Sequence, residues 1–62
     1  MEEQEIRDRI QDRIDSYKSE IEENEKLMNE FPEEMYNVLD IRVDVQKECI
    51  KYLEEIIEEF FD

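Results

Sequence analysis

A single proline, Pro32, divides a chain of 62 residues that contains no glycine. Proline disfavours the α conformation at the residue before it and is well accommodated in the first turn of a new helix. Glu33 and Glu34 follow it and suit the positive end of a helix dipole. We therefore expect one domain with a helix over about 3–30, a turn at about 30–32, and a second helix over about 32–61.

Apolar residues recur at alternating spacings of three and four on both sides of the proline, which is typical of helices that pack in a bundle. The first stripe consists of Ile10, Ile14, Tyr17, Ile21, Asn24, Met28 and Phe31, widened by Ile6 and Leu27. The second stripe consists of Tyr36, Leu39, Val43, Gln46, Ile50, Leu53, Ile57 and Phe60. If the chain folds back at Pro32, residues whose numbers sum to 63 or 64 face each other, and nearly every facing pair is apolar. The sequence predicts an all-α fold, an antiparallel two-helix hairpin.

Two polar residues interrupt the apolar seam. Asn24 is expected opposite Leu39, and Gln46 opposite Tyr17, whose hydroxyl could satisfy the Gln46 amide. Buried amides at such positions can fix the register of helices at some cost in stability. The alternative is that both amides lie near an open edge and meet water.

Two other architectures fit parts of the chain. Residues 38–46 alternate apolar and polar side chains, with β-branched residues among the apolar ones, which is the pattern of a strand that would pair with a second chain. The first stripe also continues beyond the proline, which would suit one long helix kinked at Pro32. Because that continuation passes through Arg42, the hairpin is the better interpretation.

A chain this short is expected to need help from self-association. It buries a small fraction of its surface, and with one cysteine and no histidine it has neither an internal disulfide nor a Cys/His zinc site. The second helix carries an additional apolar stripe that the first helix cannot cover, and this stripe is the predicted dimer interface: Val38, Ile41, Val45, Cys49, Tyr52 and Ile56. Two hairpins would then form a four-helix bundle. This layout resembles the small plasmid-encoded Rop-type hairpin dimers, although no motif is shared and the basic RNA-reading face of that family is absent.

The chain is strongly acidic, with 21 Asp and Glu against 8 Lys and Arg and a net charge of −13. Such a surface repels phosphate backbones and anionic lipids, so we expect neither direct nucleic-acid binding nor membrane binding. A basic surface of a protein partner, such as a nucleic-acid-binding protein, is the natural counterpart. The acidic start and the lack of a long apolar stretch predict a cytoplasmic protein without a secretory signal.

The residues needed for most enzyme chemistry are missing. Without histidine or glycine, the chain has no phosphate-cradling loop, no histidine-activated nucleophile and no imidazole ligand, so we expect no catalysis, no cofactor and no metal. Cys49 is expected to pack as a small apolar residue. The carboxylates of 54–59 lack the histidine that helical di-metal sites add, and Arg42 stands where a calcium loop would need an oxygen.

The last residues of the chain carry five acids and no base, and these residues are the predicted partner-binding site: Glu54, Glu55, Glu58, Glu59, Phe60, Phe61 and Asp62. Carboxylates at the end of a helix oppose its dipole, so folding does not require them there. Three functions remain open. The chain could be an acidic inhibitor that mimics DNA, of a phage or plasmid type. It could be an antitoxin-like or anti-sigma-like protein that masks an apolar groove. It could also be a structural assembly or adaptor bundle.

Overall fold

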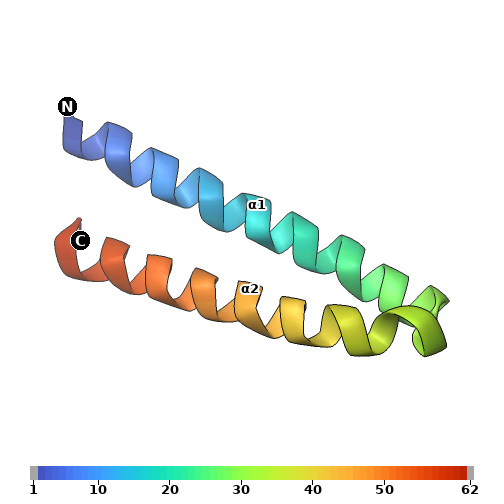
Figure 1. The fold of residues 1–62 in the computed structure, drawn as a ribbon. Helices are drawn as coiled ribbons and strands as arrows, with labels where there is room; N and C mark the ends of the chain where they lie inside the picture. The colour runs from blue at the N-terminus through green and yellow to red at the C-terminus, as the bar shows by residue number, and fades with distance from the viewer. Residues whose placement is uncertain (1, 62) are drawn as a thin grey trace.

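The computed structural model describes residues 2–61 and consists of two antiparallel helices joined by a tight turn (Figure 1). Helix α1 spans Glu2–Glu30 and helix α2 spans Pro32–Phe60, each within one residue of the expected bounds. The hairpin is a rod with extents of 47 × 15 × 12 Å. The hairpin fold predicted from the two apolar stripes is therefore confirmed.

The turn consists of one residue, Phe31, which takes part in the hydrogen bonding of both helices. Its N–H donates to the carbonyl of Leu27 at 2.8 Å, and its carbonyl accepts from the N–H of Met35 at 2.8 Å. Its backbone angles are φ −130° and ψ 65°, outside the α region, as the following proline requires. Pro32 lies in the first turn of α2, where its missing N–H leaves no hydrogen bond unmade.

The core is a single row of side chains between the helices. Ile14 and Ile21 from α1 pack with Leu39, Val43, Gln46 and Ile57 from α2, and all six are buried. Half-buried neighbours extend this row along both helices: Ile10, Tyr17, Asn24, Met28, Ile50 and Leu53. The central part of both predicted stripes thus forms the seam.

The ends of the stripes do not follow the prediction. Tyr36, Phe60 and Phe31 are exposed, although all three were expected in the seam. Met35 and Phe61, one position away from Tyr36 and Phe60, are half-buried instead. A straight α-helix turns about 20° per heptad away from a strict seven-residue repeat, so a stripe that faces its partner at the centre points away at both ends.

Residues 38–46, for which a strand was an alternative, are helical throughout. In a strand every second residue would lie on the same face, whereas in a helix every second residue lies on nearly opposite sides, so the apolar residues of this segment are divided between two faces. In the helix, Leu39 and Val43 point into the seam, while Val38, Ile41 and Val45 lie on the outside. The continuous kinked helix is likewise not observed, because the chain reverses at Phe31 (Figure 1).

Candidate functional site

The C-terminal turns of α2 form the acidic end of the hairpin, which we define as Glu54, Glu55, Glu58, Glu59, Phe60 and Phe61. The four glutamates are exposed, and no basic residue lies in the last turn of α2. The helix closes with the Phe61 N–H donating to the carbonyl of Ile57 at 2.9 Å. Asp62, which was also assigned to this site, lies outside the described residues. The local charge opposes the helix dipole, as the sequence indicated.

The two aromatic rings of the acidic end differ in their surroundings. Phe60 is 72% exposed, whereas Phe61 is half-buried. The Phe60 ring therefore has little cover from the rest of the hairpin. A large ring this exposed among carboxylates is available for contact with another molecule.

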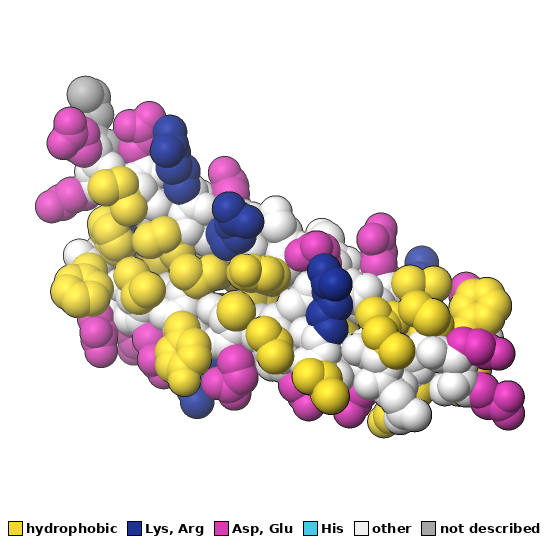
Figure 2. Space-filling model, in the orientation of Figure 1, with side chains coloured by type: hydrophobic (Ala, Val, Ile, Leu, Met, Phe, Trp, Pro, Cys, Tyr) yellow, Lys and Arg dark blue, Asp and Glu magenta, His cyan; other side chains and the backbone are white. Residues whose placement is uncertain are grey.

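The outer stripe of α2 is exposed along most of its length. Val38, Ile41, Val45, Tyr52 and Ile56 are between 38% and 68% exposed, and Cys49 is half-buried. Figure 2 shows apolar side chains in a band along the rod over both helices, with acidic side chains along its margins and at its ends. Exposed apolar side chains that gather on one side of a molecule mark a candidate contact surface.

This band also includes residues of α1 that sequence reasoning had assigned elsewhere. Ile6, Leu27 and Phe31 were expected to widen the seam, but they are 37% to 50% exposed. Because both helices are right-handed and run in opposite directions, the edge of α1 that carries them borders the same side of the rod as the outer stripe of α2. We call the combined surface the apolar face. The signal was present in the sequence as the exposed edge of the first stripe.

The same helical geometry places three arginines on or beside the apolar face. Arg9 and Arg13 follow Ile6 at spacings of three and four along the edge of α1, and Arg42 lies on α2 next to Ile41. Figure 2 shows basic side chains within and beside the apolar band. This face therefore carries less of the negative charge than the rest of the rod.

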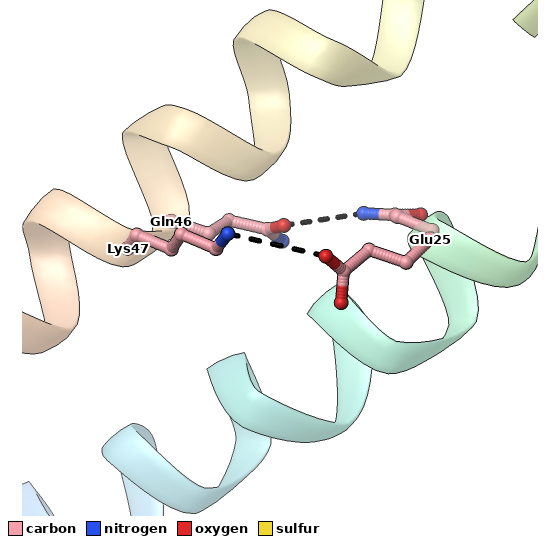
Figure 3. A network of polar contacts seen from close by, with 4 residues as sticks. Glu25, Gln46 and Lys47 are labelled. Carbon is pink, nitrogen blue, oxygen red and sulfur yellow. Dashed lines mark hydrogen bonds and ion pairs between the residues drawn. The ribbon is translucent and has the colours of Figure 1, made fainter. Parts of the chain in front are cut away.

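Two polar contacts join the helices near the middle of the rod (Figure 3). The Nδ2 group of Asn24 donates to Oε1 of Gln46 at 3.2 Å, and Gln46 is only 5% exposed. The expected partner of Gln46, Tyr17, is thus wrong, and so is the idea that Gln46 meets water. Beside this bond, Nζ of Lys47 lies 3.9 Å from Oε2 of Glu25. Both charged side chains are about half exposed, so this ion pair contributes little to stability.

Surface hollows are found on the described part of the chain. One surface hollow is lined by Ser19, Glu22, Glu23, Glu25, Lys26 and Asn29, and another by Glu2, Glu5, Ile6 and Arg9. Each is lined by α1 alone, so it is a space between neighbouring side chains of one helix. Within residues 2–61, no three acidic or cysteine side chains are grouped as a metal ion would require.

Neither described helix is long and apolar enough to cross a membrane. No protein-family model, no curated protein and no solved structure matches this chain.

Proposed function

We propose that this protein is a non-enzymatic acidic binding protein that docks on a basic surface of a protein partner, as DNA mimics of phages and plasmids do. The observation that carries this proposal is the acidic end, where four exposed glutamates and the 72% exposed ring of Phe60 occupy the last turns of α2. Carboxylates spaced along a helix can occupy cation sites that would otherwise hold phosphates. The exposed ring would anchor the contact by burial, while the charges steer and orient it.

We further propose that the protein acts as a homodimer in which two hairpins form a four-helix bundle. The exposed outer stripe of α2 supports this proposal, because a hairpin with so few buried apolar residues gains stability when that stripe is covered. Val45→Asp should therefore weaken association. Analytical ultracentrifugation that finds the wild-type protein monomeric at micromolar concentration would count against the dimer.

The docking proposal can be tested by capture on immobilised protein from a bacterial lysate, followed by elution with a salt gradient. The test variant changes Glu54, Glu55, Glu58 and Glu59 to Gln. The control variant changes Glu22, Glu23, Glu30 and Glu33 to Gln, which removes the same number of charges from exposed positions at the other end. We expect capture by the wild type and the control but not by the test variant, and release of the captured protein by duplex DNA.

Two results would redirect this proposal. Equal capture by the wild type and the test variant would show that the acidic end is not the binding site. Captured protein that resists both salt and duplex DNA would favour the alternative function, in which the exposed stripe of α2 masks an apolar groove of an antitoxin-like or anti-sigma-like partner. The salt dependence separates the two because screening weakens charge contacts far more than apolar burial.

A further inference from the structure

The apolar face holds more large apolar side chains than the core. Within residues 2–61, five apolar residues are buried: Ile14, Ile21, Leu39, Val43 and Ile57. Ten large apolar residues are exposed, and most of them lie on the apolar face. A helix pair of this size is not expected to be stable with so small a core, so the face needs a cover that is present whenever the protein is folded. A second copy of the chain is always available for this role.

The distribution of charge also allows a second copy to bind this face, despite the net charge of −13. Arg9, Arg13 and Arg42 lie on or beside the face, and Figure 2 shows acidic side chains along its margins and at its ends. Two copies that meet through the apolar face therefore keep most of their carboxylates apart and in water. Their mutual repulsion is smaller than the net charge suggests, because solvated charges further apart than about 10 Å are largely screened at ordinary salt.

The spacing of residues on the face indicates how the copies would be arranged. On α2, the pairs Val38 with Ile56 and Val45 with Cys49 share a midpoint at position 47. A twofold axis at this level would place an apolar residue next to an apolar residue in both pairs.

We infer that a second copy docks face to face on the apolar face, about a twofold axis perpendicular to the helices at the level of position 47. Each α2 then lies antiparallel to α2 of the second copy, with Val38 next to Ile56 and Val45 next to Cys49. This inference rests on the proposed dimer and specifies its geometry. The contact reaches the acidic end at Ile56, whereas Glu54 and Glu58 lie on the side of α2 that is turned away from the outer stripe.

The arrangement has a consequence for partner binding. A perpendicular twofold axis places the two acidic ends at opposite ends of the dimer. Because Glu58 lies eleven positions beyond the axis, the two sites are separated by about 30 Å at a rise of 1.5 Å per residue. The dimer is therefore a bivalent binder that can engage two basic sites at once.

Cysteine cross-linking tests this geometry directly. The test protein carries Val38→Cys and Ile56→Cys in a Cys49→Ser background, and the controls carry only one of the two new cysteines in that background. Within one chain, positions 38 and 56 are about 27 Å apart along the helix, so they cannot form an internal disulfide. Mild oxidation should convert most of the double variant to covalent dimer on a non-reducing gel and leave both single variants uncross-linked. Val45→Cys with the native Cys49 is a second pair about the same axis and should behave like the double variant.

Three outcomes would overturn the inference. Single variants that cross-link as fast as the double variant would mean parallel α2 helices. If the variants are helical by circular dichroism and dimeric in ultracentrifugation, but neither cysteine pair cross-links, the two copies meet through another surface. A monomeric wild type would mean that the face does not bind a second copy, whereas the capture experiment on the acidic end would be unaffected.

Discussion

Asn24 and Gln46 lie 22 positions apart in the chain and join the two helices through one hydrogen bond of 3.2 Å in the middle of the seam. Side chains on a helix lean toward its N-terminus, and in antiparallel helices these directions converge. The two amides therefore meet although their backbone positions are not level with each other. Figure 3 shows the Gln46 side chain extended along the rod toward its partner.

This bond predicts a strong difference between single and double substitutions. Gln46→Leu leaves the Asn24 amide without its partner and should cost about 1 kcal/mol, since a half-buried donor loses its acceptor. Asn24→Leu combined with Gln46→Leu removes both polar groups and should match or exceed the wild-type stability. Thermal unfolding of the four proteins in a double-mutant cycle measures the coupling. A Gln46→Leu protein more stable than the wild type would contradict the importance of the bond.

The double variant should also lose structural uniqueness. The polar pair disfavours shifted packings in which an amide would face an apolar side chain. With leucine at both positions, we expect additional oligomers or broadened amide NMR signals. A single species with sharp signals would show that the apolar seam alone sets the register.

Ile14 is the most deeply buried side chain of the described residues, with 0% exposure. Ile14→Ala should cost about 2–5 kcal/mol, because the cavity lies where both helices meet. This is a large part of the stability of a 62-residue chain, so the variant should be mostly unfolded at 37 °C by circular dichroism. Ser19→Ala, at an exposed polar position of α1, is the control and should cost much less.

Added salt should stabilise the protein, because it screens the repulsion among its negative charges. Raising NaCl from 0.05 to 0.5 M screens the repulsion among 21 acidic residues and should raise the melting temperature. The variant with Gln at 54, 55, 58 and 59 should be more stable than the wild type at low salt by about 1 kcal/mol, because it also relieves the opposed dipole of α2. Its response to salt should be smaller. A melting temperature that falls with salt would contradict this account.

Pro32 should determine whether the chain folds back. Pro32→Ala lifts the restriction on Phe31 and restores an N–H, so a continuous helix of about 90 Å becomes accessible. Such helices would bury their stripes against a second chain, in an extended dimer. Small-angle scattering should then detect a particle far longer than the 47 Å rod. An unchanged scattering profile would show that seam packing alone closes the hairpin.

The sequence predicted the hairpin and the centre of the seam well, since stripes at spacings of three and four leave few ways to pack. The prediction was wrong where residues directly opposite each other on the two helix backbones were assumed to be in contact. Tyr17 was matched to Gln46 by residue number alone, without the lean that lets Asn24 reach it. It also failed at the ends, where Tyr36 and Phe60 turn out of the seam as the strict repeat drifts.

The outer stripe of α2 was predictable because α1 has too few apolar residues to cover both faces of α2. The contribution of Ile6, Leu27 and Phe31 to the apolar face was missed. They lie at the edge of the first stripe, and their place on the same side as the outer stripe of α2 follows only when both right-handed helices are set antiparallel.

The one-residue turn fixes the length of the connection between α1 and α2. Because the N–H and the carbonyl of Phe31 are both committed to helical hydrogen bonds, neither end of the turn can absorb an added residue. A single insertion in α1 would rotate everything upstream of it by about 100° and move Ile14 out of the seam. Related chains of other lengths should therefore differ by matched steps of seven residues in both helices, about 10 Å at a time. The hairpin can therefore lengthen only by whole heptads, and in both helices together.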